Sequence, residues 1–399
     1  MSDSSGTGGG WRRLAFSIYL PTTVSFIGFG AVVPLIPLTA RELGASVAEA
    51  ALVVALMGVG TLLGALPAGV LAARFGEKKA LLGALIVDVI CLLVCAFAPN
   101  EWVLASAVFV IGLSGAVLTL ARQSYLTVAV PLDFRARALS TLGGVFRIGS
   151  LIGPLVGAAV VSVWGLQAAY LVAAGTSTIA AAVTVALPDL PSPDQAPTEK
   201  VRLGRVLREH SRAFVTAGVG AAALMLVRAS RDALLPLWCE QVGLDAPTTS
   251  LIFALSYGID MTLFYLGGMV MDRFGRRWVA VPAMVIMGCG FALLPLTSSV
   301  VTVALVAALL GLGNGISAGV VLTIGADNSP TIGRPQFLAG WRLTTGIGQA
   351  VGPLLITAIA AVATLGAASL AIGAIGLLGA GWLWRWVPPA SSPVANGQR

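Results

Sequence analysis

Residues 268–277 read GMVMDRFGRR, and residues 69–79 read the related GVLAARFGEKK. Each stretch begins with glycine, carries Arg-Phe-Gly near its centre and ends in basic residues, and each joins two long apolar segments. The second copy begins 199 residues after the first. A repeated loop between apolar segments predicts a chain built from two copies of one membrane-embedded helical unit.

The same offset aligns prolines, loop arginines and a glycine-proline pattern along both halves. The matched pairs are Pro37 and Pro236, Gly44 and Gly243, Arg135 and Arg334, Gly149 and Gly348, Gly153 and Gly352, and Pro154 and Pro353. A single gap-free offset that aligns all of these is hard to obtain by chance. We therefore expect an N-terminal six-helix bundle at 1–187, a proline-rich cytoplasmic linker at 188–212 and a C-terminal six-helix bundle at 213–399.

Composition places most of the chain in lipid. Hydrophobic residues make up 57% of the 399 residues and charged residues 10%, whereas soluble domains carry about 25% charged residues. A helix needs about 20 apolar residues to cross a bilayer. The sequence predicts an all-α membrane protein with 12 transmembrane helices in two pseudo-symmetric six-helix bundles. The predicted spans are 14–38, 50–73, 80–99, 102–130, 138–163, 166–187, 213–238, 248–271, 278–296, 300–325, 337–361 and 363–386.

The basic residues predict the orientation of these helices. Of the 24 Lys and Arg residues, five lie within spans, and Arg41 alone lies in a loop on the side opposite the termini. Basic loops remain in the cytoplasm. Both termini are therefore expected there, in a multi-pass protein of the plasma (inner) membrane. The first apolar run follows Arg12 and Arg13 without a small-residue cleavage site, which indicates a retained span rather than a signal peptide.

Several function classes lack the residues that they need. No GxxxxGK[ST] loop is present to hold phosphates, so transport is expected to be driven by a gradient. The four cysteines form no CxxC pair and His210 is the sole histidine, which argues against a metal site or a catalytic triad. An intramembrane enzyme and a non-transporting sensor are the alternatives from other classes. We expect no enzyme, no cofactor and no nucleic-acid partner; the expected partners of this monomer are a small-molecule substrate, protons and the lipid bilayer.

The loop at 268–277 resembles the G-x-L-x-D-R-x-G-R-K/R motif of the major facilitator superfamily. The matching residues are Gly268, Asp272, Arg273, Gly275 and Arg276. The first-half copy keeps Gly69, Arg74 and Gly76, but Ala73 stands at the aspartate position and Glu77 at a basic one. The resemblance implies a secondary transporter in which this loop gates the conformational cycle. Its glycines are expected to permit close approach of helix backbones.

A second motif resembles the antiporter motif of drug:proton exporters in this superfamily. It lies in the fifth span and comprises Gly149, Gly153, Pro154 and Gly157. Small residues at this spacing let two helices approach closely, and proline bends a helix. The resemblance implies the 12-span drug:proton antiporter branch and favours export. Helix packing alone is the alternative reading, because the eleventh span repeats the pattern.

Carboxylates within spans are candidates for proton coupling, because burying a charge in the bilayer costs at least about 2.5 kcal/mol. Asp260 lies near the middle of the eighth span with no basic neighbour on that helix, so we rank it first, before Asp232 and Asp88. Arg228 and Asp232 are spaced to pair on one helix face. Arg231 is then predicted to face elsewhere, towards Asp260 or a substrate. Asp88 is equally consistent with a hydrogen bond between helices.

The candidates for the substrate cavity are the polar and aromatic side chains Arg122, Arg147, Arg228, Arg231, Tyr257 and Asn314. Arg342 lies near a helix end, where its side chain can extend to the membrane surface. We expect a proton-coupled exporter of small molecules, a drug or metabolite antiporter, that works by alternating access. The alternative is proton-coupled uptake of a polar or anionic solute, which the excess of arginines over aspartates within the spans favours.

Overall fold

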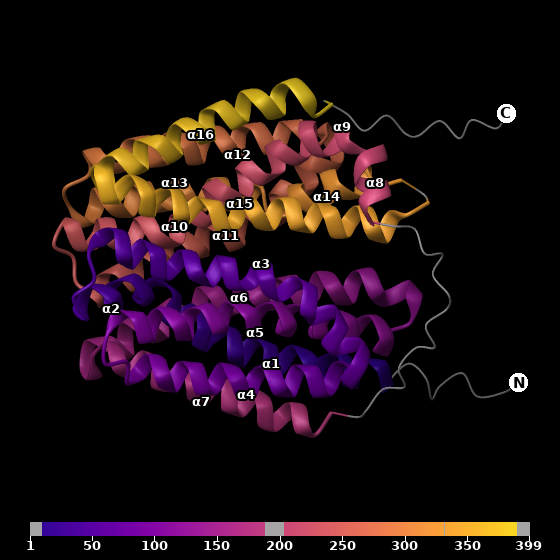
Figure 1. The fold of residues 1–399 in the computed structure, drawn as a ribbon, viewed down its shortest axis with the longest axis horizontal. Coiled ribbons are helices and arrows are strands. Elements are labelled where there is room, and N and C mark those ends of the chain that lie inside the picture. Colours follow the sequence, from indigo (N-terminus) through magenta and orange to yellow (C-terminus); the bar gives the residue numbers. More distant parts are fainter. Residues whose placement is uncertain (1–9, 188–202, 331, 389–399) are drawn as a thin grey trace, which may run out of the picture. The chain divides into compact units, whose positions relative to one another are not determined.

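The computed structural model describes residues 10–187, 203–330 and 332–388, and this part of the chain is predominantly α-helical (Figure 1). It divides into two compact units. The first comprises residues 1–196 and 245–254, and the second comprises 197–244 and 255–399. The predicted linker at 188–212 lies mostly outside the described residues, which include only 203–212 of it.

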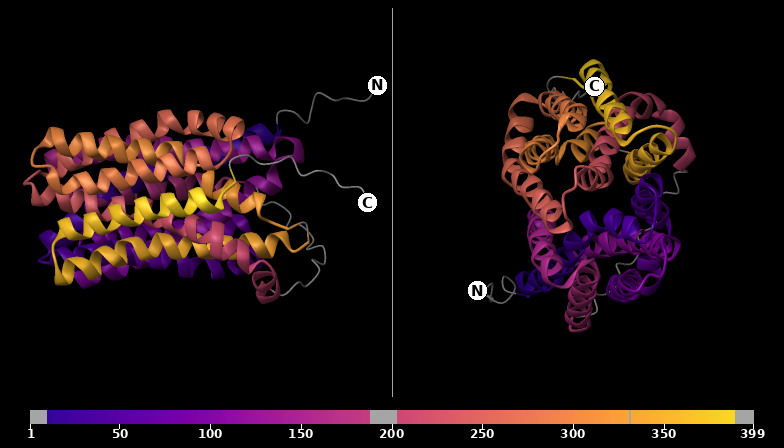
Figure 2. Two further views of the ribbon diagram at one scale, coloured as in Figure 1. Left: turned by 90° about the horizontal axis from the view of Figure 1, so that it is seen from above. Right: turned by 90° about the vertical axis from the view of Figure 1, so that its left-hand side faces the viewer.

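The first unit is a bundle of long helices that lie alongside one another (Figure 2). Helix α3 packs along α5, α1 packs on α6 and α7, and α4 packs on α5 and α7. Leu81, Leu85, Tyr125 and Leu126 belong to its buried core. The elements are α1 (Gly10–Val32), the 3-10 turn η1 (Val33–Leu35), α2 (Ile36–Glu42), α3 (Val47–Phe75), α4 (Glu77–Ala96), α5 (Glu101–Ala129), α6 (Leu132–Trp164) and α7 (Leu166–Val185).

The second unit is a bundle of the same type. Helix α10 packs along α15 and α16, and α12 packs on α13 and α16. The elements are α8 (Leu203–Glu209), α9 (Ser211–Ala213), the π-helical turn η2 (Phe214–Gly218), α10 (Val219–Gln241), α11 (Ala246–Phe274), α12 (Arg277–Leu293), the 3-10 turn η3 (Leu294–Leu296), α13 (Val300–Ile316), α14 (Val320–Asp327), α15 (Arg334–Val362) and α16 (Leu365–Trp386). The part of α11 before Leu255 belongs to the first unit.

The twelve predicted spans are confirmed as twelve helical segments of the described chain that are long and apolar enough to cross a membrane. Four spans differ from a single predicted helix: the first, seventh and ninth contain the short turns η1, η2 and η3, and the tenth is broken. Pro34 falls within the 3-10 turn η1 that joins α1 to α2 in the first span. The tenth span breaks between α13 and α14, at residues 317–319, where Gly315, Ser317 and Gly319 weaken the helix.

Equivalent turns and contacts recur in the two units. Gly44 and Gly243 have φ of 96° and 84°, and Gly76 and Gly275 have φ of 83° and 95°, all in the left-handed region that glycine occupies at little cost. The helix contacts repeat as well. A Cβ at Gly112 would collide with the carbonyl oxygen of Met57, and one at Gly311 with that of Ser256. Both members of this second pair lie 199 residues after those of the first.

Candidate functional site

A chain of hydrogen bonds crosses three helices of the second unit at Asn314. The Nε of Arg228 on α10 donates to Asn314 Oδ1 on α13 over 2.6 Å. Asn314 Nδ2 in turn donates to Asp260 Oδ2 on α11 over 2.5 Å. Asp260 and Asn314 expose 5% and 6% of their surface. Asn314 therefore connects a cation to a carboxylate inside the apolar bundle, where their pairing offsets the cost of burial.

Glycines on α13 bring Asn314 into reach of α11. A Cβ at Gly315 would lie 2.6 Å from the Asp260 carbonyl oxygen, and one at Gly311 would collide with the Ser256 carbonyl oxygen. The two helix backbones are therefore in direct contact on either side of Asn314. Asn314 lies in the last turns of α13, just before the break in the tenth span, and its own carbonyl oxygen accepts a hydrogen bond from Ser317.

Arg231 and Asp232 form a second polar pair in this unit. The Nε of Arg231 lies 3.5 Å from Asp232 Oδ1, yet neither atom makes a hydrogen bond. The Arg231 guanidinium lies 4.5 Å from the centre of the Tyr257 ring, and its NH1 donates to Ser256 Oγ over 3.4 Å. We expected Arg231 to face towards Asp260 or a substrate rather than Asp232; it interacts electrostatically with Asp260, but the expected separation from Asp232 is wrong. Its long side chain reaches the neighbouring carboxylate, and the Nε of Arg228 is instead engaged by Asn314.

Arg122 is buried in the first unit. It exposes 3% of its surface, its NH2 donates to Ser25 Oγ on α1 over 2.7 Å, and its guanidinium lies 5.5 Å from the centre of the Phe26 ring. Its side chain therefore stays inside the bundle rather than extending to the surface. Two further arginines that lie within predicted spans differ in burial: Arg147 is half-buried and Arg342 is exposed.

Asp88 connects three helices of the first unit. Its Oδ1 accepts from Ser114 Oγ on α5 over 3.3 Å, and its Oδ2 accepts from Ser177 Oγ on α7 over 3.2 Å. The residue is buried on α4. Each carboxylate oxygen has a hydroxyl partner on a neighbouring helix, which is the arrangement of a hydrogen bond that holds a bundle together.

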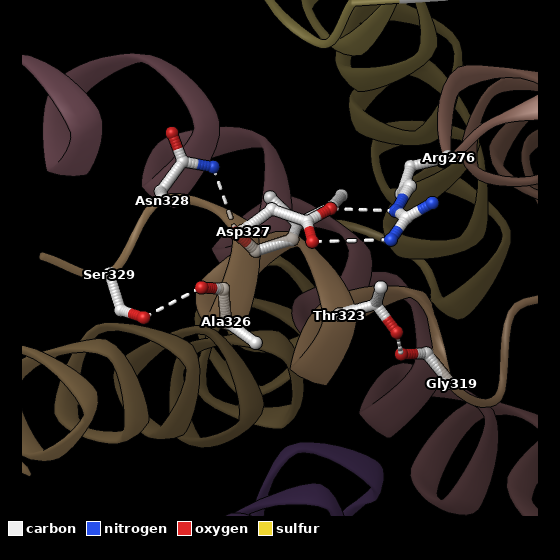
Figure 3. Close-up of polar contacts among 8 residues, drawn as sticks. Arg276, Gly319, Thr323, Ala326, Asp327, Asn328 and Ser329 are labelled. Atoms are coloured by element: carbon white, nitrogen blue, oxygen red, sulfur yellow. Dashed lines mark hydrogen bonds and ion pairs between the residues drawn. The ribbon is translucent and has the colours of Figure 1, made fainter. Parts of the chain in front are cut away.

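Each repeated loop is tied to the second span that follows it in the same unit, near the end of that span. Arg276 binds Asp327 at the end of α14 with two contacts, Nε to Oδ2 over 2.6 Å and NH2 to Oδ1 over 3.2 Å (Figure 3). At the equivalent place in the first unit, Ser124 Oγ donates to Glu77 Oε1 over 3.0 Å. Glu77 stands at the position equivalent to Arg276. Its hydrogen bond with the neutral Ser124 therefore takes the place of the ion pair found in the second unit. Asp272 is exposed at the end of α11.

The motif glycines do not all serve the expected purpose. A Cβ at Gly268 would have no neighbour within 4 Å, and one at Gly69 would meet only Leu120 Cδ2 at 3.9 Å. The expected close approach at these two positions is therefore wrong. Gly267 makes it instead, against the backbone of Ile316, because successive helix residues point about 100° apart. Gly76 and Gly275 serve the turn, through their positive φ.

The glycines of the fifth span pack against the first helix of the same unit. A Cβ at Gly149 would collide with Phe26, one at Gly153 would lie 2.6 Å from Gly30 Cα, and one at Gly157 would lie 2.8 Å from the Ala31 carbonyl oxygen. Helix α6 continues through Pro154. The copy in α15 packs likewise on α10, where a Cβ at Gly352 would lie 2.5 Å from the Leu226 carbonyl oxygen.

Comparison with known proteins identifies the family. The family model described as Major Facilitator Superfamily matches residues 18–263 and 217–399. The chain belongs to the Major Facilitator Superfamily. Members of this family are membrane transporters, and this chain has twelve helical segments long and apolar enough to cross a membrane within its described residues.

Curated proteins and solved structures also resemble this chain. The Multidrug resistance protein MdtG of Salmonella arizonae is 32% identical over 167 residues, a match that covers 41% of this chain and 41% of that protein. The match therefore spans about two fifths of the curated relative's length. A POT family transporter solved in complex with 5-aminolevulinic acid superposes with a TM-score of 0.80 at 13% identity, covering 96% of this chain and 97% of that one.

A D-xylose-proton symporter superposes with a TM-score of 0.72 at 15% identity, covering 94% of this chain and 98% of that one. At such low identity these two solved structures bear on the fold alone.

The amide of Asn314 bridges a cation and a carboxylate. Arg228 has only donors and an ionised carboxylate only acceptors, so the amide of Asn314 can bridge them in one orientation.

Sequence reasoning found the charged residues of these clusters and also named Asn314 and Tyr257, but it missed the serine partners. Ser25, Ser114 and Ser177 are single hydroxyls in apolar helices, and nothing in the sequence distinguishes them from other serines. The pair Gly311 and Gly315 could have been found, because its GxxxG spacing encloses Asn314.

Proposed function

We propose that this transporter is a proton-coupled exporter of small molecules, drugs or metabolites, that works as an antiporter by alternating access. The observation that carries the proposal is the buried chain from Arg228 through Asn314 to Asp260. In this mechanism Asp260 carries the proton. Its uptake breaks the hydrogen bond from Asn314 and loosens α11 from α13, and its release restores both. The break in the tenth span beside Asn314 gives these helices a place to move.

Two further observations support export. The curated relative that matches two fifths of the chain is named a multidrug resistance protein. The fifth span carries the glycine-proline pattern at Gly149, Gly153 and Pro154 that drug exporters share, although its contacts with α1 also suit packing. We place the monomer in the plasma (inner) membrane with both termini in the cytoplasm, since nearly all loop arginines and lysines then lie inside.

Proton-coupled uptake of a polar or anionic solute is the second candidate. Arg231 favours it, because this buried guanidinium has an Nε without a hydrogen-bond partner and could accept an anionic group. A solved structure of the same fold is described as a D-xylose-proton symporter. In this case substrate and proton would move in the same direction.

The direct test measures proton flux in inverted vesicles from cells that overproduce the protein. The vesicles are acidified, and a pH-quenched dye reports proton release when lipophilic cations, zwitterions or organic anions are added. Export predicts that one class releases protons from the lumen in exchange for its own uptake, with the effect lost in Asp260→Asn and retained in Asp88→Asn. If no class releases protons although the protein is folded and abundant, export is rejected, and solute accumulation in whole cells then tests uptake.

A further inference from the structure

An apolar groove lies on the first unit, between helices α3 and α4, with α5 as its floor. Its volume is about 500 Å³, within the range of about 300 to 1,000 Å³ that is typical of ligand sites. The residues that line it are Gly64, Pro67, Leu71, Phe75, Lys79, Ala80, Gly83, Ala84, Val87, Val110, Leu113, Ser114 and Val117.

The groove has the length of one membrane leaflet. Its lining on α4 runs from Lys79 to Val87, about 12 Å along a helix, and on α3 from Gly64 to Phe75, about 16 Å. The hydrocarbon core of a bilayer is about 30 Å thick, so each leaflet contributes about half of this. The end with Phe75 and Lys79 adjoins the turn between α3 and α4. The groove therefore extends from the membrane surface towards the bilayer centre.

The chemistry of the groove is apolar along its length and basic at its outer end. Lys79 is the one charged residue among those that line it, and it is exposed. Arg74, also exposed, lies over the Phe75 ring beside it at 5.5 Å. Ser114 offers no hydroxyl to a ligand, because its Oγ already donates to Asp88 and to the Ile111 carbonyl oxygen. An occupant must therefore combine a hydrocarbon tail with a negatively charged head.

We propose that this groove binds an anionic phospholipid of the surrounding leaflet, with one acyl chain along α3, α4 and α5 and the phosphate at Lys79. Basic residues at a membrane surface attract anionic lipids by about 1 kcal/mol each. The same lysine disfavours a lipophilic cation. In the proposed orientation the leaflet is the cytoplasmic one. The site is separate from Asp260, so it does not depend on the direction of transport.

Gly83 allows the groove to be filled without disturbing the bundle. A Cβ there would have no neighbour within 4 Å, so the side chain of Gly83→Leu would extend into the groove. Gly175→Leu is the matched control, because Gly175 on α7 is an exposed glycine with equally open space and does not line the groove. Lys79→Gln tests the contribution of the lysine charge to lipid binding. Its control is Arg385→Gln, which removes an exposed cation from the end of α16.

The experiment is native mass spectrometry of the full-length protein in detergent, titrated with phosphatidylglycerol or phosphatidylcholine. Wild type and Gly175→Leu should bind phosphatidylglycerol in preference, and Gly83→Leu should lose one bound molecule. Lys79→Gln should reduce the preference about fivefold, while Arg385→Gln should leave it unchanged.

Equal lipid binding by wild type and Gly83→Leu would overturn the proposal. Equal binding of the two lipids by wild type would overturn it as well. Tetraphenylphosphonium is a lipophilic cation, which Lys79 should disfavour, so displacement of the lipid by this cation from the control Gly175→Leu would also overturn the proposal. If Gly83→Leu does not fold, Lys79→Gln decides, since it alters only an exposed side chain.

Discussion

At the scale of single residues, the clusters around Asp88 and Asp260 show two ways of keeping a carboxylate inside a membrane bundle. Asp88 receives two serine hydroxyls from neighbouring helices, whereas Asp260 receives an amide that also holds an arginine. The first arrangement needs no countercharge in direct contact. The second links the carboxylate to a cation through a group that a proton on Asp260 Oδ2 would displace, which is why we assign coupling to Asp260.

Removing the bridging amide should uncouple the cluster. We predict that Asn314→Ala lowers proton-driven transport at least about tenfold, because two hydrogen bonds to charged partners, worth about 1.5 to 3 kcal/mol each, are lost. Transport into proteoliposomes under an imposed pH gradient measures this. Asn328→Ala is the matched control, since exposed Asn328 donates only to the Ile324 carbonyl oxygen. If Asn314→Ala transported at the wild-type rate, Asn314 would have no role in the mechanism.

The charged residues could be predicted from the sequence, but their partners could not. A charge in an apolar span is conspicuous, whereas its contacts depend on how helices far apart in the sequence are rotated against each other. Arg231 illustrates this. Helical spacing favoured Arg228 as the partner of Asp232, yet the Nε of Arg231 lies beside that carboxylate while the Nε of Arg228 donates to Asn314 on α13.

At the scale of helices, close packing rests on glycines whose positions the sequence predicts only in part. The glycines of α6 face α1 as expected from their spacing, whereas Gly69 and Gly268 face open space and Gly267 makes the contact. Which face of a helix is buried changes with each residue, so neighbouring glycines differ in role. The break between α13 and α14 was also missed, because apolar composition continues across it.

Packing of α1 against α6 predicts a specific sensitivity. Gly153→Ala should lower stability by about 1 to 3 kcal/mol, because its Cβ would lie 2.6 Å from Gly30 Cα and must push the helices apart. Gly144→Ala in the same helix has open space and should leave stability unchanged or slightly raised. Thermal unfolding in detergent compares them. Equal melting temperatures for the two variants would contradict the described contact.

The start of α11 predicts a pH dependence. Hydrogen bonds from Thr248 lower the pKa of Asp245, whose Oδ1 accepts the Thr248 backbone N–H over 2.9 Å. A lowered pKa means that this cap stabilises the helix above the unfolded value of about 3.9 and is lost as the pH falls through the folded value. Asp245→Ala should therefore speed hydrogen exchange at Thr248 near neutral pH, and the difference from wild type should shrink as the pH falls through the lowered pKa of Asp245.

A neutral cap provides the control for this prediction. Asp245→Asn keeps an acceptor oxygen for the Thr248 N–H but lacks the negative charge that strengthens this hydrogen bond. Its exchange rate near neutral pH should thus lie between those of wild type and Asp245→Ala and show no added loss of protection in acid. If Asp245→Ala and wild type exchange alike at neutral pH, the cap does not stabilise α11.

At the scale of the whole molecule, two copies of one unit explain most of what the sequence predicted. The repeated offset, the twelve spans and the glycine turns all follow from the duplication, and each half repeats them. The charges do not repeat. Asn314 and Asp260 stand where the first half has Gly115 and Thr61. The polar cluster is thus an addition to one half, and the repeat pattern gives no clue to its geometry.

Orientation is a property of the whole chain and can be tested by accessibility. Cysteines introduced at Ser298 and Ala363, both exposed in turns at one end of the helices, should react with an impermeant maleimide in intact cells. Cysteines at Lys79 and Arg385, both exposed and both on the predicted cytoplasmic side, should react only in inverted vesicles. Of the native cysteines, Cys289 is replaced first, because the other three are buried. The reverse labelling pattern would place the termini outside.

The most direct test of the central claim, that Asp260 carries the coupled proton, compares two transport modes of Asp260→Asn in proteoliposomes. We predict that the variant loses accumulation driven by a pH gradient and keeps counterflow, in which labelled substrate exchanges for unlabelled substrate without net proton movement. Asn is close to Asp in size and retains an acceptor oxygen for the Asn314 amide, so the fold and the substrate site should persist. Gradient-driven accumulation at the wild-type rate by Asp260→Asn would contradict the account.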